Sequence, residues 1–96
     1  MKTIWKFELD MEEINDASET FEVLMPKKAE VIYVDTQYGK PCLWAVVDSD
    51  ADKELRYFRI AGTGHPLDKK AFAGKHLGSF QLLGGGLVFH LFDAVS

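Results

Sequence analysis

The sequence predicts an all-β domain, and three observations point to that fold class. Short segments along the chain alternate apolar and polar residues with the two-residue period of a strand. Glycine, proline and polar residues interrupt these segments roughly every ten residues, as turns do in small β proteins. Aromatic residues make up 12% of the chain, and their abundance favours sheet over helix. Because no segment shows a convincing amphipathic helix, we expect one domain over residues 1–96, a small sandwich or barrel of about seven strands.

Five strands are expected in the first two thirds of the chain. Their predicted ranges are Thr3–Leu9, Thr20–Met25, Ala29–Thr36, Cys42–Asp48 and Glu54–Ala61. Pro26 ends the second strand, because proline has no N–H to donate to a ladder. Strict alternation puts Val31 and Val34 on opposite faces of the third strand. It also puts Arg56 and Arg59 on opposite faces of the fifth.

The uncharged stretch Leu77–Phe92 predicts the hairpin around which the domain is organised. Two apolar, aromatic-rich runs flank Gly84–Gly86, and glycine reaches the positive φ of tight reversals without steric cost. Both faces of the two strands are largely apolar, so we expect this C-terminal hairpin to be central, with little of it exposed. The glycines are not read as a phosphate loop, because a strand follows and no Lys-Ser/Thr is present.

Composition and charge exclude several classes of protein. The single cysteine, Cys42, rules out an intramolecular disulfide and fits a reducing compartment. No run approaches the ~18 apolar residues of a membrane span, and the acidic N-terminal region is not typical of a signal peptide. The net charge of −4 argues against broad nucleic-acid binding, which requires many phosphate contacts. We therefore expect a soluble cytoplasmic protein with no membrane partner.

Four phrases of the sequence carry a resemblance to a known family. They are Ile4–Phe7, Met25–Asp48, Arg56–Leu67 and Leu77–Phe92, which includes FQLLGGGLVFHLF. Together they resemble an uncharacterised domain-of-unknown-function family of short bacterial and phage or prophage proteins. The resemblance implies a small intracellular accessory protein encoded by a phage, and it assigns no chemistry. Because such proteins often interfere with host factors, it also implies a host protein as a partner.

The best candidate for a ligand site is the phrase GTGHP, which begins the long aperiodic segment Gly62–His76. Glycines let backbone amides approach a ligand closely, a threonine adds a hydroxyl and a histidine adds a titratable ring. An arginine on the preceding strand can supply a fork for a carboxylate or phosphate. The candidate ligand-binding residues are Arg56, Arg59, Gly62, Thr63, Gly64 and His65. The structural alternative is a strand-to-loop transition whose histidine only contacts the backbone.

Other constellations are weaker. Cys42, His65, His76 and His90 stand at no metal-ligand spacing, so neither a metal nor another cofactor is expected. Cys42 is read as a small packing residue, and His90 as a core or inter-strand histidine.

Three readings of function compete, and binding is favoured over catalysis. The first is a non-enzymatic binding protein that acts on a host protein through an acidic surface, comprising Glu12, Glu13, Asp16 and Glu19. The second is a binder of a small anionic ligand, such as a nucleotide, through residues 56–66. The third and least favoured is an enzyme that uses His65 as general base. Apolar residues on both faces of several strands also predict a homodimer.

Overall fold

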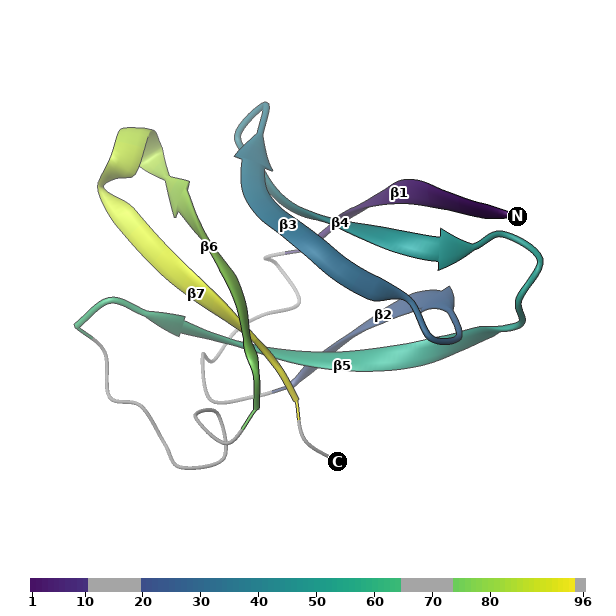
Figure 1. Ribbon diagram of the computed structural model, residues 1–96. Helices are drawn as coiled ribbons and strands as arrows, with labels where there is room; N and C mark the ends of the chain where they lie inside the picture. Colours follow the sequence, from purple (N-terminus) through teal and green to yellow (C-terminus); the bar gives the residue numbers. More distant parts are fainter. Residues whose placement is uncertain (11–19, 65–73, 95–96) are drawn as a thin grey trace.

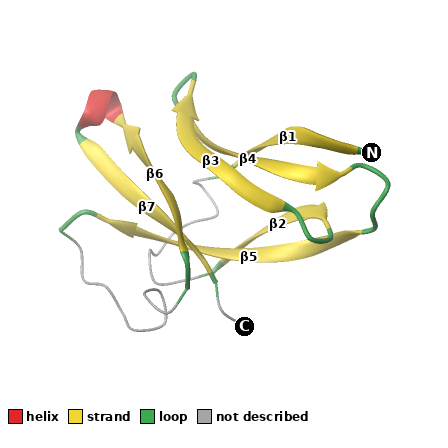
Figure 2. Cartoon of the chain, in the orientation of Figure 1, coloured by secondary structure: helices red, strands yellow, loops and turns green. Residues whose placement is uncertain are grey.

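The computed structural model describes residues 1–10, 20–64 and 74–94. Within these ranges the chain forms strands joined by turns, and no α-helix (Figures 1 and 2). The strands are β1 (Lys2–Glu8), β2 (Phe21–Pro26), β3 (Glu30–Gln37), β4 (Lys40–Asp48), β5 (Lys53–Gly62), β6 (His76–Leu82) and β7 (Leu87–Asp93). One 3₁₀ turn, η1 (Leu83–Gly85), connects the last two. The prediction of a seven-stranded all-β fold is confirmed. No helix in the described ranges is long and apolar enough to cross a membrane.

The strands form two antiparallel sheets and not a closed barrel. One sheet has the order β1-β4-β3 and the other has the order β2-β5-β7-β6. The two sheets face each other across the core, and the β3–β4 and β6–β7 hairpins turn at the same end of the molecule (Figure 1). Of the two alternatives left by the sequence, a sandwich or a barrel, the structure therefore has the sandwich.

The core lies between the inner faces of the two sheets. The three-stranded sheet contributes Leu43, Ala45 and Val47 from β4 and Val34 from β3, while the four-stranded sheet contributes Phe58, Ile60, Phe80 and Leu91. Each fully buried large apolar side chain contributes roughly 1.5–3 kcal/mol relative to an exposed one. A domain of this size can therefore fold without disulfides.

A β-bulge in β3 corrects the strict alternation expected there. The register of β3 against β4 shifts between Val31 and Tyr33, so Ile32 has no directly opposed partner on β4. Val31 and Val34, three residues apart, both pack against the core. An extra residue in one strand reverses the face of everything that follows, which residue counting alone does not reveal.

Only one strand of the C-terminal hairpin lies in the interior of its sheet, whereas the sequence predicted that the whole hairpin would be central. β7 lies inside its sheet, paired with β5 and β6, but β6 is an edge strand. Phe80 and Phe89 stack at 5.5 Å on the inner face. On the outer face, Ser79 and Gln81 are exposed, so the expectation that little of the hairpin meets water is wrong for that face.

The edges of the two sheets meet where β3 runs beside β6. Gly78 lies against Val34 so closely that a Cβ at position 78 would be 2.7 Å from the Val34 Cβ. At the hairpin ends, the Thr36 hydroxyl donates a hydrogen bond to the carbonyl of Gln81. Among the described residues, β3 and β6 contact each other through side-chain packing and through this hydrogen bond of Thr36. The two strands do not pair as a ladder.

Candidate functional site

Four side chains form a hydrogen-bonded row across the outer face of the four-stranded sheet. Thr63 Oγ1 lies 2.8 Å from His90 Nε2, and His90 Nδ1 lies 2.8 Å from Ser79 Oγ. Ser79 Oγ is in turn 3.4 Å from Nε2 of His76. We call Thr63, His90, Ser79 and His76 the polar row. Its members come from β6, β7 and the turn that follows β5, and all except the half-buried His90 are exposed.

Strand register explains how the polar row assembles. Ser79 pairs directly with His90 across β6 and β7, and Ala61 pairs with His90 across β5 and β7. Thr63 follows Ala61 by two residues, and its backbone N–H donates to the carbonyl of Val88. A bulge between His76 and Gly78 then puts His76 and Ser79 on the same face although they are three residues apart.

Aromatic and basic side chains border the polar row. His76 meets the ring of Phe92 edge-on at 5.3 Å, and Phe92 is only 8% exposed. Arg59 pairs with Phe92 across β5 and β7, so it lies on the same face of the sheet as the polar row. Two residues before Arg59, Tyr57 is 45% exposed on this face. The surface therefore combines hydroxyls, imidazoles, a guanidinium and an exposed ring.

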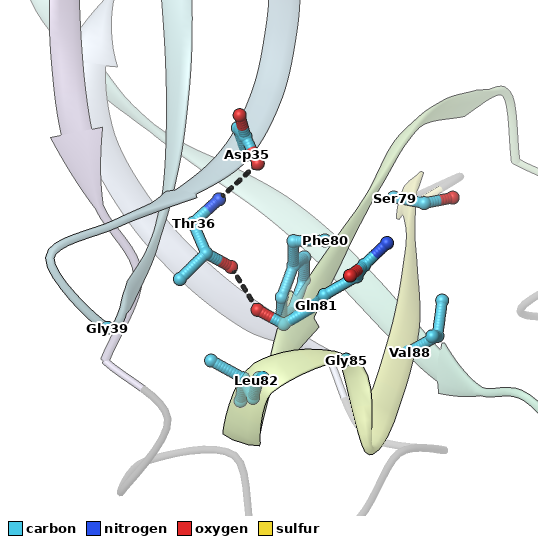
Figure 3. Close-up of a pocket in the computed structure, with 10 residues that line it drawn as sticks. Asp35, Thr36, Gly39, Ser79, Phe80, Gln81, Leu82, Gly85 and Val88 are labelled. Carbon is cyan, nitrogen blue, oxygen red and sulfur yellow. Dashed lines mark hydrogen bonds between the residues drawn. The ribbon is translucent and has the colours of Figure 1, made fainter.

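A hollow of about 520 Å³ adjoins the polar row at Ser79. It lies between β3 and the β6–β7 hairpin, with Asp35 and Thr36 on one side and Ser79, Gln81 and Val88 on the other (Figure 3). The Asp35 carboxylate accepts hydrogen bonds from the Thr36 N–H and the Tyr33 hydroxyl. Because the Asp35 carboxylate is itself an anion, the hollow is suited to the hydrogen-bond donors of a ligand and not to an anionic group.

The structure brings together part of the predicted ligand site. Thr63 belongs to the polar row, and Gly64 follows it with φ of 84°, a conformation that favours glycine. Gly62 is the buried last residue of β5 and pairs with Phe89. Of the two arginines, only Arg59 shares the outer face with Thr63.

Arg56 has a different environment, on the inner side of β5. Its Nη1 donates to the carbonyl of Ala29 at 2.8 Å, and its Nη2 lies 3.4 Å from a carboxylate oxygen of Asp93. The guanidinium also lies 5.6 Å from the centre of the Phe58 ring. These contacts link β5 to β7 and to the β2–β3 turn, and they put Arg56 on the opposite side of β5 from the polar row.

The other predicted residues lie outside the described part of the chain. They are His65, from the ligand site, and the acidic residues Glu12, Glu13, Asp16 and Glu19. Their predicted roles as ligand-binding, catalytic or partner-binding residues remain predictions.

Sequence reasoning missed three of the four residues in the polar row. The glycine turn at Gly84–Gly86 could have indicated the contact between Ser79 and His90. If Leu82 pairs with Leu87 across this turn, the same register puts Ser79 opposite His90. Nothing local indicates that Thr63 meets His90, since this depends on how β5 pairs with β7. His90 itself is an inter-strand histidine, as predicted, but with both ring nitrogens engaged by hydroxyls.

The geometry of the polar row differs from that of a catalytic serine–histidine–aspartate triad. In a serine–histidine–aspartate triad, Nε2 faces the nucleophile and a carboxylate orients the imidazole through Nδ1. Here Nδ1 faces Ser79, and a second hydroxyl, that of Thr63, occupies the orienting position. The orienting position beside the His90 imidazole is therefore held by a hydroxyl and not by a carboxylate.

The comparisons with known proteins concern the family and not the chemistry. No curated protein and no solved structure matches the chain. One family model, described as a domain of unknown function, matches residues 1–96. The match spans every element of both sheets, including the strands that carry the polar row. The chain therefore belongs to this family, domain of unknown function DUF7352.

Proposed function

We propose that this protein is a non-enzymatic binding protein for a small phosphate-bearing ligand of the nucleotide class. The observation that carries the proposal is the polar row, in which two hydroxyls flank one imidazole on the face that also presents Arg59. The phosphate would bind the polar row, and hydrogen-bond donors of the remaining ligand would face Asp35 and Gln81 in the adjoining hollow.

The chemistry of His90 supports an oxyanion as the ligand. A neutral imidazole donates one hydrogen bond and accepts one, so one of the two flanking hydroxyls must donate to it. The other hydroxyl accepts from the imidazole, so its own hydrogen can point outward. An outward hydroxyl and a guanidinium are the kind of donors that phosphate oxygens accept.

The test measures binding of AMP, ATP and inorganic phosphate by calorimetry and by the shift in melting temperature. A ligand at 100 times its dissociation constant stabilises the native state by about 2.7 kcal/mol. We expect Ser79→Ala and Arg59→Gln to weaken binding of AMP about tenfold or more, since each removes a donor to a charged group. His90→Phe removes the ring nitrogens that bond both hydroxyls, so it should also weaken binding of AMP.

Two control variants separate this proposal from the other readings. Ser49→Ala removes a hydroxyl that donates to the carbonyl of Met1, away from the polar row, and should leave AMP binding unchanged. Neutralising Glu12, Glu13, Asp16 and Glu19 together should also leave it unchanged, while it would abolish binding to a host protein if that reading holds. Unaltered AMP binding in Ser79→Ala and Arg59→Gln, or no binding of any of the three probes, would contradict the proposal. Conversion of ATP to products would show an enzyme instead.

A further inference from the structure

The outer edge of β1 presents a row of backbone groups that point away from its own sheet, at a place independent of the polar row. In the β1–β4 ladder the N–H of Leu9 donates to the carbonyl of Pro41, and the N–H of Ser49 donates to the carbonyl of Met1. The register between these two bonds is unbroken, so the odd-numbered residues of β1 bond β4. Within residues 1–10, 20–64 and 74–94, β4 is the one strand that pairs with β1. The N–H and C=O groups that point outward are therefore those of Lys2, Ile4, Lys6 and Glu8.

The other three edge strands present less backbone for pairing. β3 and β6 lie against each other at the corner described above, so each blocks the edge of the other. On β2, the N–H of Lys27 donates to the carbonyl of Asp52, which leaves the even-numbered residues pointing outward. One of them is Pro26, which has no N–H and whose carbonyl already accepts a bond within the β2–β3 turn. Only Glu22 and Leu24 of β2 remain, so β1 is the longest edge available in the described part of the chain.

We propose that β1 pairs antiparallel with β1 of a second copy, across a twofold axis perpendicular to the sheet. The two three-stranded sheets then form one six-stranded sheet, in the order β3-β4-β1-β1-β4-β3. Such an axis keeps the inner faces of both copies on the same side. Trp5 and Phe7, which pack against the core of their own copy while remaining half-buried, then gain neighbours from the inner face of the second β1.

Backbone geometry and charge together select one register for this pairing. Outward backbone groups must meet each other, so even-numbered residues oppose even-numbered residues. Placing Lys2 opposite Glu8 of the second copy uses the whole of β1, centres the pair on Trp5 and joins opposite charges at both ends. A slide of two residues in one direction places Lys2 opposite Lys6, and a slide in the other places Lys6 opposite itself. Like charges directly opposite are destabilising, so neither of these registers competes.

The lysines of β1 do not protect its edge in the selected register. Lysine on an edge strand commonly opposes pairing with another chain. Here Lys2 meets a carboxylate, and Lys6 lies opposite Ile4 of the second copy. The Lys6 ammonium also donates to Oε1 of Gln37 on β3 at 2.8 Å, so it is directed back across its own sheet and away from the edge.

The backbone bonds determine the strength expected of the dimer. Four opposed pairs, each exchanging two bonds, give about eight backbone hydrogen bonds. Specific protein interfaces have roughly 10 ± 5 direct hydrogen bonds, and main-chain bonds supply most of the affinity when one strand is added to a sheet edge. A single pair of strands buries less area than a standard interface. We therefore expect a weak dimer that dissociates in the micromolar range, with a mass of twice 10.8 kDa at high concentration.

Amide hydrogen exchange followed by NMR tests the geometry of the pairing. Raising the protein concentration from about 20 μM to about 1 mM should slow exchange of the even-numbered amides of β1 by at least about threefold. The odd-numbered amides, such as those of Trp5 and Phe7, already bond β4 and should not change. Sedimentation equilibrium measures the mass over the same range. A chain that stays monomeric up to about 1 mM, or a dimer without concentration-dependent protection of the even-numbered amides, would overturn the proposal.

Reversal of charge tests the register. Lys2→Glu places two carboxylates opposite each other at both ends of the pair, and Glu8→Lys places two ammonium groups there. Each variant alone should dimerise about tenfold more weakly than the parent chain, and mixing the two should restore a dimer with one copy of each, as measured by native mass spectrometry. Lys53→Glu makes the same change in net charge at an exposed position on the other sheet and should leave dimerisation unchanged. A mixture that forms no heterodimer would contradict the register.

A matched pair of proline substitutions locates the edge. Ile4→Pro removes one outward N–H of β1 and leaves the bonds of the odd-numbered residues to β4, so it should weaken dimerisation at least about tenfold. Leu24→Pro makes the same change on the outward edge of β2 and should leave dimerisation unchanged. Ile4→Thr keeps the N–H and should also leave it unchanged. A dimer weakened by Leu24→Pro and not by Ile4→Pro would show that another edge forms the interface.

Discussion

At the scale of single residues, Cys42 shows how a side chain on an outer face is nevertheless excluded from water. It belongs to the outward-facing set of β4, opposite Glu8 and Asp35 in the neighbouring strands, yet it is only 1% exposed. Burial raises the pKa of its thiol, and Lys6 opposes this effect to a smaller extent. The Sγ atom lies 3.5 Å from the carbonyl of Lys40. This environment suits a packing residue and not a nucleophile, in agreement with the sequence-based interpretation.

We predict that the Cys42 thiol of the native protein reacts slowly with a disulfide reagent. A raised pKa leaves a smaller fraction of thiolate at any given pH, and burial blocks approach of the reagent. At pH 8 the native rate should be lower than the rate in guanidinium chloride by on the order of 100-fold. The absorbance of released thionitrobenzoate measures both rates. Equal rates in the folded and unfolded protein would show that the thiol is accessible.

At the scale of elements, the contact between β3 and β6 joins the two sheets at one corner. Bulges occur in both strands, between Val31 and Tyr33 in one and between His76 and Gly78 in the other. The close approach of the strands depends on the missing side chain at Gly78, which lies against Val34. The same corner forms the walls of the hollow that adjoins Ser79. Packing between the sheets therefore shapes the hollow beside the polar row.

We predict that Gly78→Ala destabilises the protein by about 1–3 kcal/mol, because the new Cβ would overlap Val34. Combining it with Val34→Gly should cost less than the sum of the two single substitutions, since the overlap is then relieved. Urea denaturation of the four proteins of this cycle gives the coupling free energy, which we expect to be about 1 kcal/mol or more. Strictly additive costs would mean that β3 and β6 do not pack as the structure shows.

At the scale of the whole molecule, stability comes from one core between two sheets. Phe58, Phe80, Met25 and Leu43 are among the largest fully buried side chains. They come from four different strands and from both sheets. A domain of this length has a total stability of about 5–15 kcal/mol, so single large cavities in this core should remove a substantial part of it.

We predict that Phe58→Ala destabilises the protein by about 3–5 kcal/mol, whereas Tyr57→Ala, one residue earlier, costs less than about 1 kcal/mol. Phe58 is fully buried on the inner face of β5, and Tyr57 is 45% exposed on its outer face. Chemical denaturation compares the two at equal protein concentration. Similar losses for both substitutions would contradict the assignment of the two faces of β5.

Much of the fold could be predicted from local patterns. Alternation and turn residues indicated all seven strands, with boundaries within one or two residues for most of them. Alternation also indicated correctly that Phe58 and Ile60 lie on one face of β5 and Tyr57 and Arg59 on the other. These predictions succeed because the side-chain period of a strand is a local property.

The candidate site could be predicted only in part, through Thr63, Gly64 and Arg59. His76 joins the polar row because a bulge moves it to the face of Ser79, and Thr63 reaches His90 because β5 pairs with β7 in one particular register. Bulges and the register between distant strands depend on packing across the whole sheet. No window of sequence contains that information.

The fold class, the strands and most of their inward faces follow from residue type and spacing along a short length of chain, so the sequence was sufficient to predict them. Tertiary packing was needed to show that β6 is an edge strand, that Arg56 bonds Ala29 and Asp93, and that Thr63, His90 and Ser79 meet. The reason is physical. A strand's alternation is encoded locally, whereas its neighbours are selected by the side chains of strands far away in the sequence, which compete to fill one core.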